Sequence, residues 1–269
     1  MKSTALSIIK CIFQNCKSLK SVTIPASANY VGFGVFSNCD SLESIEVEKT
    51  NEKYVSIDGV LYDKAVSIAI LFPAGKQISS FTIPSTVTKI EDYSFLNAQH
   101  VEIITLPSSV KEIGNNAFNG CVKLTTVNLN EGLKKIERHA FAECKLLQSI
   151  TIPNTTTFIG EYAFINCEQL QEIILGTSLQ FIQSQTFAGL HPEVLITFLG
   201  DKSPQMCTND LFDIKRKYPY IQVLKHFSGQ FFCGEDVVTI SSVVEQKKID
   251  KYKRSRDTPA PTGYQKLEL

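Results

Sequence analysis

Cysteine is the residue type in this chain that most invites a chemical role, and there are eight of them. Thiolates bind zinc, act as nucleophiles and form disulfides. The common zinc and thioredoxin-type motifs contain a C-x-x-C pair, and this sequence has none. Disulfide frameworks are typical of secreted chains under about 100 residues, and 269 residues can build a core without one. The spacing of the cysteines therefore decides their role.

Most of the cysteines belong to a repeat that is easiest to read from phenylalanine. Phenylalanine recurs at steps of 23 residues, with one longer step of 36 residues. These positions are Phe13, Phe36, Phe72, Phe95, Phe118, Phe141, Phe164 and Phe187. Three residues after them come Cys16, Cys39, Gly75, Ala98, Cys121, Cys144, Cys167 and Leu190. Because the same column accepts glycine, alanine and leucine, it predicts buried structural thiols and no metal or catalytic site.

The distance between neighbouring repeats would by itself permit disulfides between their cysteines. Adjacent strands lie roughly 4.8 Å apart, and bridged cysteines have Cα separations of about 4.4–6.8 Å. Cys144 with Cys167, or Cys16 with Cys39, would fit those limits. We nevertheless expect free thiols throughout, so that titration of the denatured protein finds close to eight.

Other reactive residue types show no arrangement that supports catalysis or metal binding. The histidines, His100, His139, His191 and His226, share no ligand spacing. No phosphate-binding loop, G-x-S-x-G or H-E-x-x-H motif occurs. In the acidic segment 41–52, Glu43 and Glu46 are not at the spacing of a calcium loop. We therefore predict no enzyme, no cofactor, and no catalytic, cofactor-binding or metal-binding residue.

The composition argues against nucleic acid as a partner and against a membrane-spanning segment. The 27 Lys and Arg balance 27 Asp and Glu, which argues against nucleic acid, because phosphate binding needs a basic excess. No apolar run approaches the roughly 18 residues that cross a bilayer, and no signal peptide is recognisable. We expect no integral membrane segment.

Further columns predict one short strand in every repeat. Apolar residues recur nine and eleven positions after the phenylalanine, and a spacing of two is strand alternation. We expect ladder strands near residues 22–24, 45–47, 81–83, 104–106, 127–129, 150–152, 173–175 and 196–198. No repeat can bury its own apolar face, so neighbours must stack into one continuous core with a parallel ladder. In the return arm, Val110 and Ile113 should point inward, and Gly32, Gly114 and Gly160 should take unusual backbone angles.

These segments resemble a known family. IPSTVTKIEDYSF, LPSSVKEIGNNAFNGC and FAECKLLQSITIP are similar to BspA-like leucine-rich repeats, as is the insertion around SIDGVLYDK. Its Asp58-Gly59 pair predicts a hairpin turn. Over residues 1–200, the resemblance implies a β-rich, right-handed leucine-rich-repeat solenoid of the α/β-solenoid class. That fold would have a parallel ladder of about eight strands, one β-hairpin insertion at about 54–72 and an irregular C-terminal cap. It also implies a binding role, commonly in cell-surface or secreted adhesion proteins of microbes and mucosal protists.

The two ends depart from the period. Residues 201–240 should form the cap, with a short helix in TNDLFDIKRKY and one more strand in YIQVL. The polar tail 245–269 carries few apolar anchors and is expected to be disordered. At the N-terminus, Ile8 aligns with Ile113 of a return arm, with no strand before it. We expect longer relatives with more repeats, and self-association through the bare edge of the first repeat.

The outward ladder positions form a hydroxyl-rich face that is a candidate partner-binding surface. Its candidate residues are Thr23, Thr82, Thr105, Asn128, Thr151, Glu172 and Ile174, and the last repeat adds Leu195 and Thr197 to the outward positions. Threonine is also a good solvated strand former, so a purely structural reading stays open. Glu46, Asn128 and Ile174 break the regular lattice that ice binding would need.

A second candidate surface lies on the return arm, where Phe158 and Phe181 are neighbours. Exposed, they would suit an interface; packed inward, they would belong to the core, and both readings stay open. Asn154 begins a glycosylation sequon, which matters only in a secreted protein.

Two functions remain. The first is a binding module for a protein or glycan, resembling a surface antigen or adhesin. The alternative is an intracellular scaffold for protein–protein interactions, favoured by the missing signal peptide and the thiols expected to be unpaired. Localisation therefore stays open between the cell surface or outside, from the resemblance, and the cytoplasm.

Overall fold

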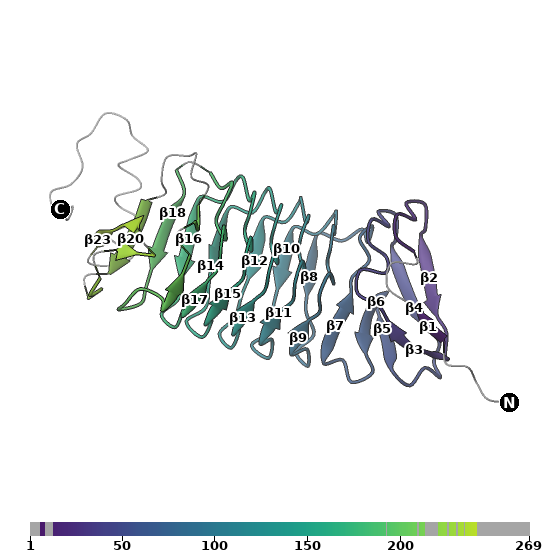
Figure 1. The fold of residues 1–269 in the computed structure, drawn as a ribbon. Coiled ribbons are helices and arrows are strands. Elements are labelled where there is room, and N and C mark those ends of the chain that lie inside the picture. Colours follow the sequence, from purple (N-terminus) through teal and green to yellow (C-terminus); the bar gives the residue numbers. More distant parts are fainter. Residues whose placement is uncertain are drawn as a thin grey trace.

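A computed structural model describes residues 6–8, 13–191, 193–208, 210–212, 220–224, 226–229, 231–233 and 235–240. In these ranges the chain forms strands β1 to β23 and no helix. The strands stack as successive turns of one elongated solenoid, with its first and last strands at opposite ends (Figure 1). We call each repeat of the stack a rung. The helix expected in 208–218 lies largely outside the described residues, and the tail 245–269 lies wholly outside them.

Each expected ladder strand is present, within about one residue of its predicted place. The eight strands are β2 (Ser21–Ile24), β4 (Ser44–Val47), β8 (Ser80–Thr82), β10 (Ile103–Thr105), β12 (Thr126–Asn128), β14 (Ser149–Thr151), β16 (Glu172–Leu175) and β18 (Leu195–Phe198). Pairing is parallel with residues 23 apart opposite each other, as for Ile104 and Val127. Two strands continue this first ladder past the eighth rung, namely β20 (Tyr220–Leu224) and β23 (Val238–Ile240). The strand predicted in YIQVL is therefore confirmed.

The return arm forms a second parallel ladder, which the sequence did not reveal. Its strands are β9 (Lys89–Ile90), β11 (Glu112–Ile113), β13 (Lys135–Ile136), β15 (Phe158–Ile159), β17 (Phe181–Ile182) and β19 (Met206–Cys207). At the other end of the stack, β1 (Leu6–Ile8) pairs in parallel with β3 (Ala28–Val31), and Ile8 lies opposite Val31. Val110 and Ile113 are buried, as predicted.

The insertion divides the core. Its β5 (Tyr54–Ile57) and β6 (Val60–Asp63) form the predicted hairpin, with positive φ at Asp58 and Gly59. A third strand, β7 (Ile68–Leu71), pairs antiparallel with β6 and parallel with β9. Along β6, Val60 and Tyr62 pack into the C-terminal core cluster, whereas Leu61 packs into the N-terminal one.

The expectation of one continuous core and ladder is therefore wrong at β6, because this strand has buried side chains on both of its faces. Burial raises the pKa of Tyr62 to about 12. Pairing within the first ladder is also interrupted between β4 and β8, and again between β12 and β14.

Phenylalanine and cysteine build the inside of the regular rungs. Consecutive rings from Phe72 to Phe212 stack with centroids 4.8 to 6.0 Å apart. The thiols of Cys121, Cys144 and Cys167 donate to the carbonyl of the phenylalanine 26 residues earlier, at 3.1 to 3.2 Å. Burial raises the pKa of Cys121 to about 12. Five described cysteines are free, and Cys39, Cys121, Cys144 and Cys167 are buried as predicted, whereas Cys16 is only partly buried. Cys11 lies outside the described residues.

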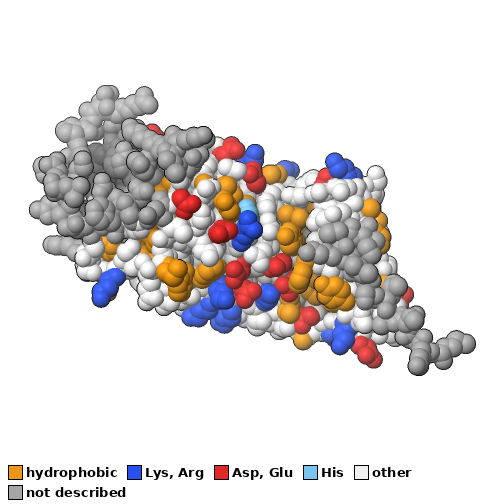
Figure 2. All heavy atoms as spheres, in the orientation of Figure 1, with side chains coloured by type: hydrophobic (Ala, Val, Ile, Leu, Met, Phe, Trp, Pro, Cys, Tyr) orange, Lys and Arg blue, Asp and Glu red, His pale blue; other side chains and the backbone are white. Residues whose placement is uncertain are grey.

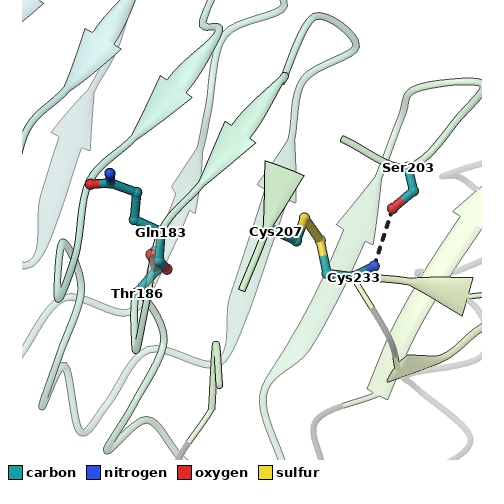
Figure 3. The surroundings of a disulfide bond; sticks show 5 residues. All are labelled: Gln183, Thr186, Ser203, Cys207 and Cys233. Atoms are coloured by element: carbon teal, nitrogen blue, oxygen red, sulfur yellow. Dashed lines mark hydrogen bonds between the residues drawn. A yellow bond between two sulfur atoms is a disulfide. The ribbon is translucent and has the colours of Figure 1, made fainter. Parts of the chain in front are cut away.

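The expectation that all cysteines are free is wrong for two of them. Cys207 and Cys233 form a disulfide with Cα atoms 5.2 Å apart (Figure 3). Neither follows the 23-residue period. Cys207 takes the inward position of the second ladder opposite Ile182, and Cys233 lies between β21 (Phe231–Phe232) and β22 (Glu235–Asp236). The backbone N–H of Cys233 also donates to Ser203 Oγ at 3.1 Å.

The return-arm glycines serve close packing. The expectation of unusual angles is wrong, because Gly32, Gly114 and Gly160 have no positive φ. A Cβ at Gly114 would lie 2.4 Å from Asp92 Oδ1, and one at Gly160 would lie 2.6 Å from the backbone nitrogen of Arg138. Glycine is therefore required there because the neighbouring rung approaches too closely for a side chain.

Candidate functional site

The hydroxyl-rich face lies on the first ladder, as expected, and is open over most of its length. Thr23, Thr82, Asn128 and Thr151 are exposed, whereas Thr105, Glu172 and Ile174 are half-buried. Asn128 Nδ2 donates to Thr105 Oγ1 at 3.2 Å, which ties two of these rungs together.

This face is covered at its C-terminal end. Leu195 and Thr197 are only 8% and 2% exposed, so the expectation that the last rung faces solvent is wrong. The ladder continues here with β20, whose Gln222 lies opposite Thr197 and is 2% exposed. A partner could reach the first ladder only on the rungs before this end.

The second ladder carries an outward row with one residue per rung. Its members, in order along the stack, are Lys89, Glu112, Lys135, Phe158, Phe181 and Met206, each opposite the next in register. Phe158 and Phe181 are half-buried, and Met206 is 66% exposed. The row therefore changes from charged to apolar between β13 and β15, while the residue beside it stays an inward isoleucine from Ile90 to Ile182.

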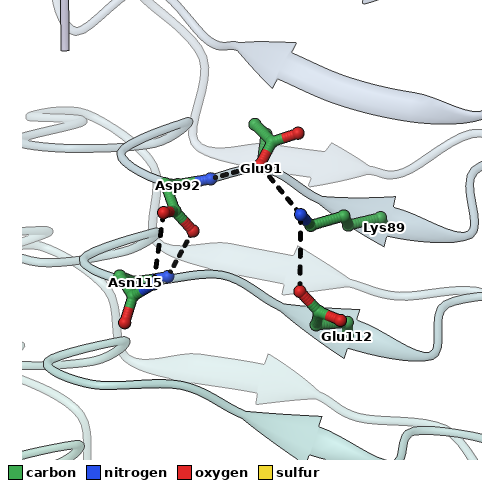
Figure 4. A network of polar contacts seen from close by, with 5 residues as sticks. All are labelled: Lys89, Glu91, Asp92, Glu112 and Asn115. Carbon is green, nitrogen blue, oxygen red and sulfur yellow. Dashed lines mark hydrogen bonds and ion pairs between the residues drawn. The ribbon is translucent and has the colours of Figure 1, made fainter. Parts of the chain in front are cut away.

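The charged half of this row is held by cross-rung bonds (Figure 4). Lys89 Nζ lies 3.0 Å from Glu91 Oε1 and 3.4 Å from Glu112 Oε1. Burial lowers the pKa of Lys89, but the hydrogen bond and charge of Glu91, together with Glu112, raise it above its usual value. Beside them, Asn115 donates to both carboxylate oxygens of Asp92, from its backbone N–H at 2.8 Å and its amide at 3.1 Å.

Glu137 belongs to the same charged rungs. Burial raises its pKa, and the acidic neighbours Glu112 and Asp92 add to that shift, while Lys135 opposes it. Together, these groups form a cluster of both signs on the rungs of β9, β11 and β13, in which four carboxylates outnumber two lysines.

The apolar half has uncharged flanks. Just before the row come Thr157, Gln180 and Gln205, and two residues after it come Gly160, Gln183 and Thr208. The corresponding flanks of the charged rungs include Lys111, Lys134, Glu91 and Glu137. We call Phe158, Phe181, Met206, Gln180, Gln183 and Gln205 the uncharged platform. In Figure 2, acidic and basic side chains gather over the middle of this face, and hydrophobic patches lie on either side of them.

The structure separates the two sets of candidate residues at this end of the stack. Phe158 and Phe181 are direct strand neighbours, as predicted. Glu172 and Ile174, however, lie on β16 in a different sheet, so the four residues do not share one strand ladder. Sequence reasoning missed Met206, because it follows Phe181 by 25 residues and falls outside the 23-residue period. Gln180 did share a column with Lys111 and Lys134, and Gln183 shared one with Glu91 and Glu137. That change of residue type was the available signal, whereas Gln205 falls outside the period like Met206.

A turn beside the second ladder holds an aromatic pair. His139 and Tyr162 stack with centroids 4.9 Å apart, and the Arg138 guanidinium lies 5.7 Å from the Tyr162 ring. Burial and the neighbouring Arg138 lower the pKa of His139, while Glu161 opposes them. Arg138 also pairs with Glu161 at 3.4 Å. These contacts join two rungs and leave little of the pair free for a ligand.

The sequon asparagine is likewise tied into the stack. Asn154 is exposed, but its amide donates to Glu131 Oε1 at 3.2 Å. Its Oδ1 accepts from the backbone N–H of Thr177, also at 3.2 Å. The side chain therefore bridges the rungs on both sides of it.

The described part of the chain holds neither a candidate metal site nor a membrane-spanning helix. No group of three or more His, Cys, Asp and Glu there could hold a metal ion. No helix in the same ranges has the length and apolar character needed to cross a membrane.

Comparisons with known proteins agree with this architecture. The family model described as a BspA type leucine rich repeat region matches residues 1–59 and 70–192 in six copies. The crystal structure of the pneumococcal vaccine antigen PcpA aligns with a TM-score of 0.75 at 24% identity, over 83% of this chain and 56% of that chain. A leucine rich cell surface protein from Faecalibacterium prausnitzii A2-165 aligns with a TM-score of 0.58 at 28% identity, over 78% of this chain and 48% of that chain.

The aligned region thus covers about half of each of these two solved structures. No curated protein matches the chain in sequence. The family match extends over well more than half of the chain. This protein therefore belongs to the family of BspA-type leucine-rich-repeat proteins.

Proposed function

We propose that this chain is a non-catalytic binding module, displayed at the cell surface or secreted, that presents its repeat surface to a protein or glycan. The observation that carries the proposal is the change along the second ladder, where ion-paired charges give way to Phe158, Phe181 and Met206. The inward residues do not change there, so packing does not require it. Adjacent solvent-facing apolar side chains on a regular surface are typical of interaction sites.

The disulfide favours a compartment outside the cytosol. Disulfides persist in oxidising surroundings and are rare in reducing ones, and Cys207 and Cys233 are bonded. The similar protein from Faecalibacterium prausnitzii is described as a cell surface protein, at 28% identity. Both observations support display or secretion.

An intracellular scaffold is the second candidate, favoured by the five free cysteines in the described residues. Four of them, Cys39, Cys121, Cys144 and Cys167, are at most 2% exposed, and their thiols donate to backbone carbonyls. Such thiols are shielded from oxidants, so they are compatible with either compartment. They therefore weigh less than the disulfide.

Antibody labelling of native cells separates the two candidates. An antibody raised against the folded chain should label intact cells or the culture medium, and brief protease treatment of intact cells should remove the surface signal. Labelling seen only after permeabilisation, with no loss on protease treatment, would overturn display and leave the scaffold.

A further inference from the structure

We infer that the uncharged platform binds a neutral glycan whose chain runs along the stack. This inference rests on the proposed function and names the ligand class for one surface. The platform spans three consecutive rungs, β15, β17 and β19, and combines two phenylalanines, one methionine and three glutamines.

The residue types match the surface of an uncharged sugar. A pyranose has C–H groups on its faces, which pack on aromatic and thioether side chains, and hydroxyls around its edge. Phe158 and Phe181 supply partly exposed rings, and Met206 adds an apolar side chain that is 66% exposed. A glutamine amide both donates and accepts hydrogen bonds, as each sugar hydroxyl requires.

The glutamines lie on both sides of the ring row. Gln180 and Gln205 come directly before the row residues of their rungs, and Gln183 comes two residues after Phe181. All three are exposed, and the structure records no side-chain hydrogen bond for Gln180 or Gln205 within its described residues. Gln183 Oε1 accepts from the backbone N–H of Glu161 at 3.2 Å, which fixes its side chain and leaves its amide N–H groups as donors.

The spacing of the rungs suits a polymer. Neighbouring strands of a ladder lie roughly 4.8 Å apart, which is close to the length of one pyranose unit in an extended chain. Phe158 and Phe181 are opposite each other in register, so successive sugars would meet successive rings. Glycine at 160, required by the close approach of Arg138, also places no side chain beside Phe158.

Charge separates this platform from its surroundings and selects a neutral ligand. Neither the row nor its two flanks carries a charged residue on β15, β17 and β19. An acidic glycan would instead favour the preceding rungs, where Lys111, Lys134 and Lys135 are solvent-facing. The hydroxyl-rich first ladder offers no aromatic ring among its candidate residues, so it lacks the stacking half of this chemistry.

The test uses the full chain and an array of neutral oligosaccharides built from glucose, mannose, galactose and N-acetylhexosamines. Sialylated and sulfated counterparts form the charged arm. The best neutral oligosaccharide is then titrated by calorimetry against wild type and three double variants. Phe158→Ser with Phe181→Ser removes the rings, and Gln180→Ala with Gln205→Ala removes the amides. Lys111→Ala with Lys134→Ala is the matched control in the same flank of the charged rungs.

Loss of the rings should weaken binding by about tenfold or more, as for aromatic side chains that a ligand covers at the centre of other interfaces. Loss of the amides should weaken it several-fold, and the lysine control should bind like wild type. Binding should change little with salt, because no charge pair is involved. The glutamines are exposed, so their variants keep the fold even where the phenylalanine variant is destabilised, and circular dichroism of each variant checks this.

Three results would overturn the inference. The first is that no neutral oligosaccharide binds. The second is that the ring variant and the amide variant both bind the oligosaccharide as tightly as wild type. The third is that the protein prefers acidic glycans and the lysine control variant loses that binding. If the platform variants instead lose binding to a cell-surface protein, the glycan inference falls while the proposed function stands. If labelling places the chain only inside cells, the proposed display falls whatever the array shows.

Discussion

The charged and uncharged halves of the second ladder share one phenylalanine core and differ mainly in their outward residues. Rungs β9, β11 and β13 carry ion pairs such as Lys89 with Glu112, and rungs β15, β17 and β19 carry the uncharged platform. Inside, the same phenylalanine stack passes through both halves. In this solenoid, inward columns therefore set the packing, while outward rows are free to vary and can carry recognition.

The largest expected effect on stability comes from the phenylalanine core, which should be packed equally well in the two halves. Phe118 lies in the charged half and Phe164 in the uncharged half, and both are 0% exposed with stacked rings on either side. Phe118→Ala and Phe164→Ala should each lower the free energy of unfolding by about 3–5 kcal/mol. Urea denaturation followed by circular dichroism measures both. A loss at one site less than half of that at the other would contradict equal packing.

The disulfide is the one covalent difference between the halves. It joins β19 to the segment between β21 and β22, at a sequence separation of 26 residues. Cys207→Ala with Cys233→Ala should lower stability by about 2–4 kcal/mol, and faster amide exchange should be confined to the C-terminal rungs. Cys144→Ala is the control for loss of a core thiol in mid-stack. Unchanged stability and exchange in the double variant would show that the bond does not hold this end.

Sequence columns predicted the eight strands and the buried thiols because phenylalanine, cysteine and isoleucine report inward packing in every repeat. The second ladder escaped prediction because strands of two residues, such as Lys135–Ile136, show no alternation to read. Strand β6 separates the two core clusters and therefore has apolar residues on both faces. Its sequence VLY cannot be told from that of an ordinary buried strand, so the division of the core could not be predicted. The disulfide could not be found from the period, since Cys207 and Cys233 are brought together only by the fold of the end.

The surfaces were harder to predict than the core. Sequence alone placed Phe158 and Phe181 side by side but could not decide whether they are exposed or packed inward. In the structure both are outward and half-buried, which lies between those two predictions. The covered end of the first ladder, at Leu195 and Thr197, depends on contacts that the repeat pattern does not encode.

A pH experiment sharpens the electrostatic side of the comparison. Burial raises the pKa of Glu137 in the folded state above its ordinary 4.5. As pH rises, Glu137 therefore loses its proton in the unfolded chain before it does so in the folded protein. The free energy of unfolding falls as pH rises from the unfolded pKa through the folded pKa, because the charged carboxylate is disfavoured in its partly buried site. Glu137→Gln should be slightly more stable than wild type at neutral pH, and the gap should close below pH 4.5. Thermal melts from acidic to neutral pH measure it; a gap independent of pH would contradict the assignment.

Surface ion pairs should give the smallest effect. Lys89 bridges Glu91 and Glu112 with its side chain about one-third exposed, so Lys89→Ala should cost at most about 1 kcal/mol, and less at high salt. Gln180→Ala in the uncharged half should leave stability unchanged at any salt concentration. Salt-dependent melts of both variants would contradict the comparison if Gln180→Ala proved the more salt-sensitive.

Hydrogen exchange of the full chain, with and without the tightest neutral oligosaccharide from the array, tests the central claim most directly. We predict that the oligosaccharide slows exchange at 157–160, 180–183 and 205–208, and leaves the equivalent segments 88–91, 111–114 and 134–137 unchanged. Slower exchange in those charged rungs or on the first ladder, or no change anywhere, would contradict a binding surface confined to the uncharged rungs.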